Sequence, residues 1–168
     1  MKLFLKRLVA YWLDIILIAF ILIFLQLLLM YKITSGFPFD YLHEGIEIEI
    51  WVFLSMSLPV WTYFISFEVC KQQTIGKRLL KLRVMNKDGS KINFYQALCR
   101  TFIRLLPWEL THVIILVPQP WWSIEMPKNP YLILIPNIIL VLYIVVLFFN
   151  KGKTGIHDYF AHTRVKEI

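Results

Sequence analysis

Three long apolar runs along the chain predict helices that cross a membrane. They cover residues 8–30, 50–67 and 131–149. At about 1.5 Å per residue, a helix over the first run reaches roughly 35 Å, enough for the hydrocarbon core of a bilayer. Because this run is longer than the apolar part of a signal peptide, we interpret it as a retained span. Pro59 lies near the middle of the second run, where neighbouring helices can satisfy the carbonyl that it frees, so we expect a kink and not a break.

A weaker apolar run, 102–118, contains Arg104 and two other titratable residues. The distribution of basic residues along the chain indicates whether this run crosses the membrane. All but two of the 18 Lys and Arg residues lie in three segments: 1–7, 69–104 and the tail from residue 151. Basic segments stay on the cytoplasmic side of a membrane. An even number of crossings places all three on that side, which favours four spans.

Four spans leave both termini in the cytoplasm of a multi-pass inner-membrane protein, with loops 31–49 and 119–130 outside. Three tryptophans, Trp51, Trp121 and Trp122, then lie at the outer membrane interface, where tryptophan is enriched. The alternative has three spans, with 94–118 lying on the membrane and the tail outside.

The composition agrees with a membrane protein of one domain. The chain has 168 residues, 58% of them hydrophobic, and a mean hydropathy of +0.63. A soluble globule of this size could not bury so much apolar surface. The net charge of +7 comes from basic residues beside the apolar runs, without the aromatic platform of a nucleic-acid-binding protein, so we expect a lipid bilayer as partner and no nucleic acid.

The basic segment between the second and third runs has a local organisation of its own. Residues 80–85 alternate as a strand does and lead into Asp88-Gly89, a turn sequence, with Ile92 on the return. This pattern predicts a short cytoplasmic hairpin.

A helix follows the predicted hairpin. Asn93 can cap it, with Gln96 three residues later as its capping-box partner. Gln96, Arg100 and Arg104 then fall on one stripe, which predicts an amphipathic helix with a basic face at the membrane interface. The stripe can serve a function or simply contact lipid headgroups, and the sequence leaves both open.

Asp14 is the most informative charged residue, because it lies about two turns into the first predicted span. A carboxylate there costs roughly 2.5–3.5 kcal/mol on insertion scales, so we expect it to face the bundle interior and to have a partner. Arg7 is about 10 Å away along the helix axis. An arginine of another helix, Arg100 or Arg104, is therefore the expected partner. Asp14 is either a proton or cation site or part of a structural ion pair.

Motifs of known enzymes are missing from the sequence. It contains no G-x-S-x-G, no H-E-x-x-H and no glycine-rich phosphate loop. His157, Asp158 and His162 could bind a metal, but a polar tail is the better interpretation. We therefore expect no enzyme activity, no metal site and no cofactor.

Several stretches match one known pattern in order along the chain. Arg7 opens the first predicted helix and Asp14 lies inside it; further matches are Gln-Thr-Ile-Gly-Lys-Arg-Leu-Leu at 73–80, Leu-Arg-Val at 82–84, Asp-Gly at 88–89, Ala-Leu-Cys-Arg-Thr at 97–101 and His-Asp-Tyr-Phe-Ala-His-Thr-Arg-Val at 157–165. Together they resemble the RDD family, which is named for one arginine and two aspartates. One departure is His162, where the family usually has glycine.

The resemblance implies a polytopic membrane protein of prokaryotes. Transport of ligands has been proposed for this family, and some members are linked to cation/proton exchange. The resemblance implies that Arg7, Asp14 and Asp158, which match the family's motifs, are the functional residues. The cost of charge inside a membrane adds Arg100 to these candidates. We expect the tail to fold back and to bring Asp158 to Arg7.

The fold expected is an all-α integral membrane bundle of about four transmembrane helices, with the short cytoplasmic hairpin and the amphipathic helix. The function expected is transport of an ion or small solute. Four helices seldom enclose a pathway alone, which implies a homo-oligomer or a partner membrane subunit. The alternative is an accessory or assembly subunit whose charges are structural.

The four-span topology can be tested by labelling introduced cysteines. A cysteine near Glu44 should react with an impermeant reagent from outside, whereas one near Lys153 should be protected until the membrane is permeabilised. Labelling of both from outside would contradict four spans.

Overall fold

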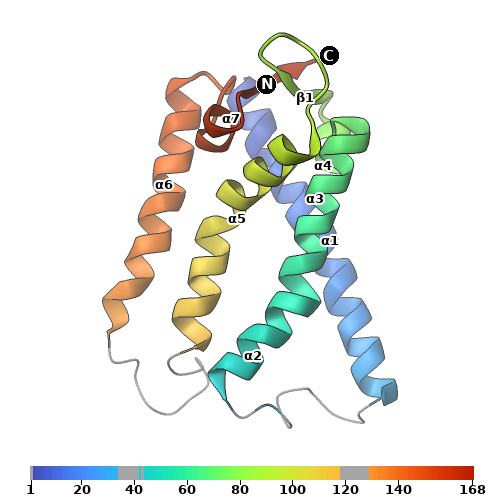
Figure 1. The fold of residues 1–168 in the computed structure, drawn as a ribbon, viewed down its shortest axis with the longest axis vertical. Helices are drawn as coiled ribbons and strands as arrows, with labels where there is room; N and C mark the ends of the chain where they lie inside the picture. Colours follow the sequence, from blue (N-terminus) through green and yellow to red (C-terminus); the bar gives the residue numbers. More distant parts are fainter. Residues whose placement is uncertain (1, 34–41, 43, 118–128) are drawn as a thin grey trace.

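The structure, a computed structural model, describes residues 2–33, 42, 44–117 and 129–168. Four helical rods run along the long axis, and both chain ends lie at the same end of the bundle (Figure 1). The first rod is α1 (Leu3–Ile33). The second is one continuous helix made of α2 (Gly45–Val52), η2 (Phe53–Ser57) and α3 (Leu58–Lys71). The third is α5 (Phe94–Leu116), and the fourth is η3 (Pro130–Ile133) followed by α6 (Leu134–Phe149).

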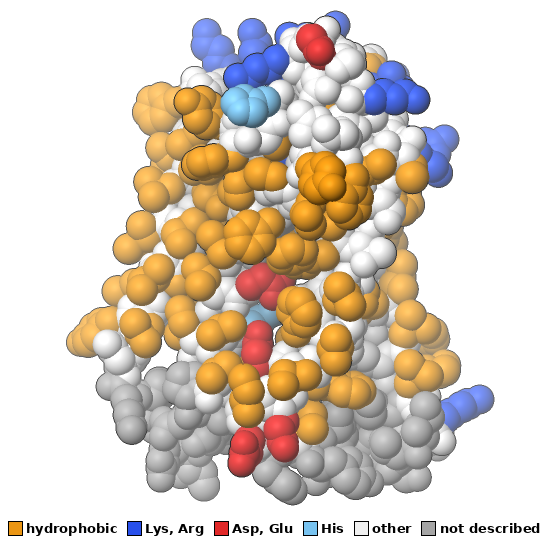
Figure 2. All heavy atoms as spheres, viewed as in Figure 1, with side chains coloured by type: hydrophobic (Ala, Val, Ile, Leu, Met, Phe, Trp, Pro, Cys, Tyr) orange, Lys and Arg blue, Asp and Glu red, His pale blue; other side chains and the backbone are white. Residues whose placement is uncertain are grey.

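Three helices are long and apolar enough to cross a membrane: Leu3–Leu29, Gly45–Lys71 and Tyr131–Phe149. They contain the three long apolar runs of the sequence. On the face that Figure 2 shows, hydrophobic side chains predominate between the two ends, with a few acidic and histidine side chains among them; this predominance is expected where the surrounding solvent is lipid. Helix α5 is not among the three, because its sequence carries several charged residues.

Pro59 does not break the second rod. Immediately before it, η2 is a turn of π-helix in which the N–H of Leu58 bonds to the carbonyl of Phe53, five residues back. A π turn changes the register of the hydrogen bonds and lets the helix continue past a residue that cannot donate.

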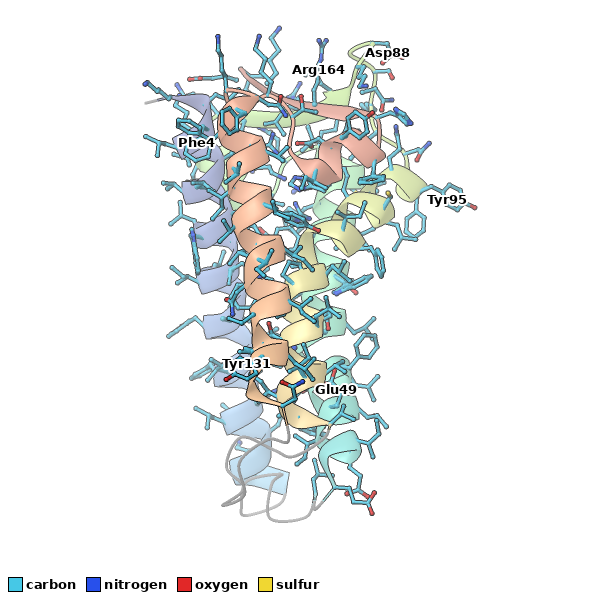
Figure 3. The ribbon with its side chains drawn as sticks, turned by 90° about the vertical axis from the view of Figure 1, so that its left-hand side faces the viewer. Phe4, Glu49, Asp88, Tyr95, Tyr131 and Arg164 are labelled. Atoms are coloured by element: carbon cyan, nitrogen blue, oxygen red, sulfur yellow. The ribbon has the colours of Figure 1, made fainter. Side chains whose placement is uncertain are left out.

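The end of the bundle that holds the termini carries a small two-stranded sheet. The helices α4 (Ile75–Leu79) and α7 (Ile156–Phe160) flank it, and its strands are β1 (Leu82–Asn86) and β2 (Thr163–Glu167). The strands are antiparallel. Figure 3 shows Asp88 and Arg164 at this end and Glu49 and Tyr131 toward the other.

This sheet corrects the predicted hairpin. The turn forms, with the N–H of Gly89 bonded to the carbonyl of Asn86, but the return segment is no strand and β1 pairs with the chain's tail instead. The reason is packing: Val84 lies opposite Val165, and both join a buried cluster. The segment after the turn has only Ile92 to bury, and it buries that side chain without forming a strand beside β1.

The capping box of α5 is confirmed, because the side chains of Asn93 and Gln96 each accept the other residue's backbone N–H. The predicted orientation of its basic stripe is wrong. Arg100 is fully buried and Arg104 is 8% exposed, so the stripe faces the bundle interior while Phe102 faces outward. Buried carboxylates on neighbouring elements draw the arginines inward, since buried charges need partners.

His162 has a φ of 55°, in the left-handed region that favours glycine. It follows α7 and turns the chain into β2. Histidine at this position, in place of the glycine that is usual in the family, therefore adopts the backbone conformation that the turn requires. The side chain is exposed, so histidine meets no steric barrier beyond the backbone conformation itself.

Candidate functional site

A network of charged side chains is buried where the tail meets the bundle. Its members come from α1, α3, α4, α5 and α7, and each is at most 8% exposed. They are Arg7, Glu68, Lys77, Arg100, Arg104 and Asp158; Asp14, 1% exposed, is buried beside them without an ion pair to any of them.

Asp158 is the first centre of this network. Arg7 donates from Nη2 to Oδ2 of Asp158 at 2.6 Å, so the predicted contact between the tail and the first helix is present. Arg100 donates to the other carboxylate oxygen, and the backbone N–H of Gly155 donates to Oδ2 at 2.7 Å. One carboxylate thus ties α7 to α1 and α5.

Arg7 also holds the turn that follows α6. Its Nη1 donates to the carbonyl of Gly152 at 3.0 Å and lies 3.3 Å from that of Lys153. Gly152 has a φ of 79°, and a Cβ added there would lie 2.4 Å from the backbone nitrogen of Phe4. Only glycine allows the turn to approach α1 this closely.

Glu68 is the second centre, and the sequence analysis missed it. Arg100 donates to it from Nε at 2.9 Å, Arg104 from Nη1 at 2.8 Å, and Lys77 from its ammonium group. Arg100 therefore bridges Glu68 and Asp158. The available signal was a single acid at the end of an apolar run, directly before a basic segment.

Asp14 does not have the partner that we predicted. Neither Arg100 nor Arg104 pairs with it, since both are held by other carboxylates. Its carboxylate instead accepts from the hydroxyl of Tyr63 at 2.7 Å, from the Thr74 hydroxyl and from a backbone N–H. No cationic group among the residues that the structure describes lies within ion-pair distance of Asp14.

The backbone donor to Asp14 is the N–H of Gly76, at 2.7 Å. A Cβ at Gly76 would lie 2.2 Å from the carbonyl oxygen of Ala10. The absence of a side chain therefore brings α4 against α1 and delivers this donor.

Burial and neighbouring charges set the protonation of the groups in the tail and in α4. Burial alone would raise the pKa of Asp158, but Arg100 and Arg7 outweigh it and hold the pKa well below its usual range. Burial lowers the pKa of His157 well below its usual value. His157 is thus neutral, as its Nε2 position 3.2 Å from Nη2 of Arg7 requires. Burial also lowers the pKa of Lys77 to about 8, against the attraction of Glu68.

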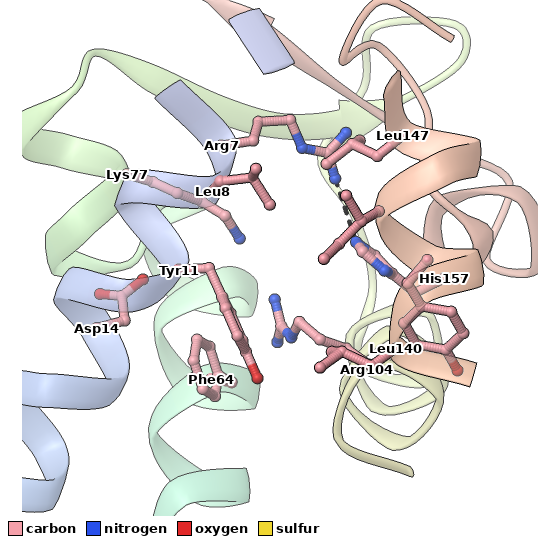
Figure 4. Close-up of a pocket in the computed structure, with 12 residues that line it drawn as sticks. Arg7, Leu8, Tyr11, Asp14, Phe64, Lys77, Arg104, Leu140, Leu147 and His157 are labelled. Atoms are coloured by element: carbon pink, nitrogen blue, oxygen red, sulfur yellow. Dashed lines mark hydrogen bonds between the residues drawn. The ribbon is translucent and has the colours of Figure 1, made fainter. Parts of the chain in front are cut away.

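A cavity of about 90 Å³ opens beside the network (Figure 4). Lys77 reaches into it from one side and Arg104 from the other, Arg7 extends across it toward α6, and Asp14 lies at its edge. Side chains of α6 form an apolar wall beside Arg7 and Arg104. Within the described ranges, no three His, Cys, Asp or Glu side chains are placed to hold a metal ion.

The sequence model of the RDD family matches residues 2–162. The chain belongs to the RDD family. No curated protein and no solved structure matches it. In this RDD protein, Arg7 and Asp158 form one buried pair, Arg100 joins them, and Asp14 lies in a separate set of hydrogen bonds beside the cavity.

A double-mutant cycle tests the contact between Arg7 and Asp158. Arg7→Ala and Asp158→Ala should each lower the free energy of unfolding by about 3 kcal/mol, because each leaves the other charge buried without that partner. The double variant should lose less than the sum. Thermal unfolding in detergent measures this, with Lys6→Ala as the control, since its ion pair with Glu167 lies at the surface and should matter less. Strictly additive losses would contradict the contact.

The lowered pKa of His157 predicts a loss of stability in mild acid. Below about pH 6.5 the unfolded chain takes up a proton at His157 before the folded chain does, so acid favours unfolding. The contribution is complete above pH 6.5 and falls by up to about 1.4 kcal/mol per pH unit below it. Melting curves between pH 7.5 and 5 should show a smaller fall for His157→Gln than for the wild type. His162→Gln, at an exposed position, should follow the wild type; equal profiles for His157→Gln and the wild type would refute the assignment.

Proposed function

We propose that this RDD protein crosses the membrane four times, with both termini cytoplasmic, and transports an ion or small solute. In addition to the three apolar helices, the proposed spans include α5. Its residues Phe94–Leu116 reach roughly 35 Å at 1.5 Å per residue. Its arginines face inward, and Glu109 accepts from Ser57 and Trp61 of the second rod, each at 2.9 Å. Each charged side chain of α5 thereby has a hydrogen-bonded partner on another element, which supports a helix within lipid.

The cytoplasmic placement of the termini rests on charge. Lys and Arg side chains gather at the end of the molecule where both termini lie (Figure 2). The same end holds β1, β2 and the tail. Under the positive-inside rule this end faces the cytoplasm.

Asp14 carries the proposal of transport. A carboxylate that only neutral donors hold can take up a proton without breaking an ion pair. The hydroxyl of Thr74 can reverse its role and accept from a protonated Asp14, so both forms keep a hydrogen bond. Because Asp14 also borders the cavity, its protonation can respond to what the cavity holds. We therefore assign Asp14 as the proton site of a proton-coupled transporter, without enzyme activity.

The second candidate is an accessory or assembly subunit, and the pairing around Glu68 and Asp158 favours it. These ion pairs tie the elements of the bundle together, as the charges of an accessory subunit with a structural role would. In both cases we propose a second copy of the chain or a partner membrane subunit, since a single bundle of this size encloses only a small cavity.

A flux assay separates the two functions. The purified protein in liposomes should move protons in response to a pH gradient, and Asp14→Asn should abolish that flux while folding is kept, because the amide has the same shape without a titratable proton. Asp88→Asn removes an exposed carboxylate of the β1 turn and is the matched control. Flux that survives in Asp14→Asn would exclude Asp14 as the proton site, and a wild-type protein without flux would favour the accessory subunit.

A further inference from the structure

The buried charged residues beside the cavity include more cations than carboxylates. The cations are Arg7, Lys77, Arg100 and Arg104, of which all but Arg100 line the cavity, and the carboxylates are Glu68, Asp158 and Asp14, of which only Asp14 lines it. With His157 neutral, the buried set has one excess positive charge. An excess charge at a buried site favours an anion there.

Two of the cations that line the cavity have hydrogen-bond donors that remain unused. In the part of the chain that the structure describes, the buried Nε–H of Arg104 has no acceptor. The ammonium group of Lys77 has three N–H donors and one partner, Glu68. The guanidinium of Arg104 is held over the ring of Phe64, with 4.0 Å from its Cζ to the ring centroid. In Figure 4 the ends of Lys77 and Arg104 point into the cavity.

The wall of the cavity that α6 forms is apolar. Leu140, Ile144 and Leu147 of α6 line it, and Leu8 of α1 lies across from them. A ligand that fits both the cations and this wall has an anionic head and an aliphatic body, as ligand pockets with a few placed polar groups generally require. At about 15 Å³ for each water-sized position, the cavity holds about six non-hydrogen atoms, which is the size of a four-carbon acid.

We propose that the cavity binds a monovalent organic carboxylate, its head between Lys77 and Arg104 and its aliphatic chain against α6. A free metal cation would meet three positive side chains, while the oxygens of Asp14 are already occupied by three donors. Binding of a carboxylate in this cavity does not depend on the proposed function. The further inference that this carboxylate is the transported solute rests on the proposed function. The ligand is either a free short-chain acid or a fatty acid from the bilayer, and the head is the same in both.

Protonation of Asp14 and binding of the carboxylate should favour each other. The neutral form of Asp14 raises the net positive charge beside the cavity, and coupling between two sites is reciprocal. Asp14→Asn mimics the protonated form and should bind the carboxylate several-fold more tightly than the wild type.

Calorimetry on the full-length protein in detergent tests the site directly. Butyrate, laurate, butyramide and butylamine are the probes. Butyrate should bind at least tenfold more tightly than the amide or the amine, which share its size and lack its charge. Tighter binding of butyrate than of laurate identifies a free acid as the ligand, and binding of laurate alone identifies a fatty acid of the bilayer.

Three variants locate the binding. Lys77→Gln should weaken it at least tenfold while Arg100 and Arg104 continue to neutralise Glu68. Leu140→Trp fills the cavity without changing any charge and should abolish it. Arg83→Gln removes an exposed cation of β1 away from the cavity and should leave it unchanged. Butyramide that binds as tightly as a bound butyrate, no binding of either carboxylate, or binding that survives Leu140→Trp would overturn the proposal.

The two proposals can fail separately. Carboxylate binding with the expected variants, but without proton flux, would retain the site and reject transport. Proton flux that depends on Asp14, without carboxylate binding, would retain transport and reject this ligand.

Discussion

The pairing of two buried carboxylates with arginine determines the architecture at the end of the bundle that holds the termini. Removing a charge from water costs several kcal/mol, which is recovered only where partners and hydrogen bonds are well placed. Glu68 and Asp158 meet that condition by sharing Arg100. Helix α5 turns its polar stripe inward for this reason, and the tail folds back across the bundle for the same reason. The pairing of β1 with β2 follows, because the returning tail lies beside β1.

The sequence predicts those features that depend on local spacing or on one long run. The three apolar runs, the Asn93–Gln96 capping box and the turn at Gly89 need only nearby residues, and the structure contains each. The contact of Arg7 with Asp158 came from the resemblance and from the reach of the tail. The strand partner of β1 was missed because it lies at the far end of the chain, whereas a hairpin was the nearest solution.

The predicted partner of Asp14 was wrong because the groups that contact Asp14 are not charged. We expected Asp14 to meet an arginine because charge is visible in a sequence, but its donors are two hydroxyls and a backbone N–H. The backbone donor depends on the absence of a side chain at Gly76, which only the packing of α4 on α1 reveals. Glu68 was missed for the opposite reason, since its place at the end of an apolar run concealed that three cations surround it.

The two aspartates that the family resemblance nominates lie in different environments, since arginines pair with Asp158 and only neutral donors contact Asp14. Two arginines hold Asp158 as an anion, so a proton there would break two ion pairs and release the tail. Asp14 has hydrogen bonds alone, and a change of its charge costs no ion pair. Arg7 connects the two environments, because it pairs with Asp158, binds the turn after α6 and lines the cavity that Asp14 borders. The fold thus fixes one carboxylate between two arginines and leaves the other beside the cavity without an ion pair, which is the difference on which the proposed role of Asp14 rests.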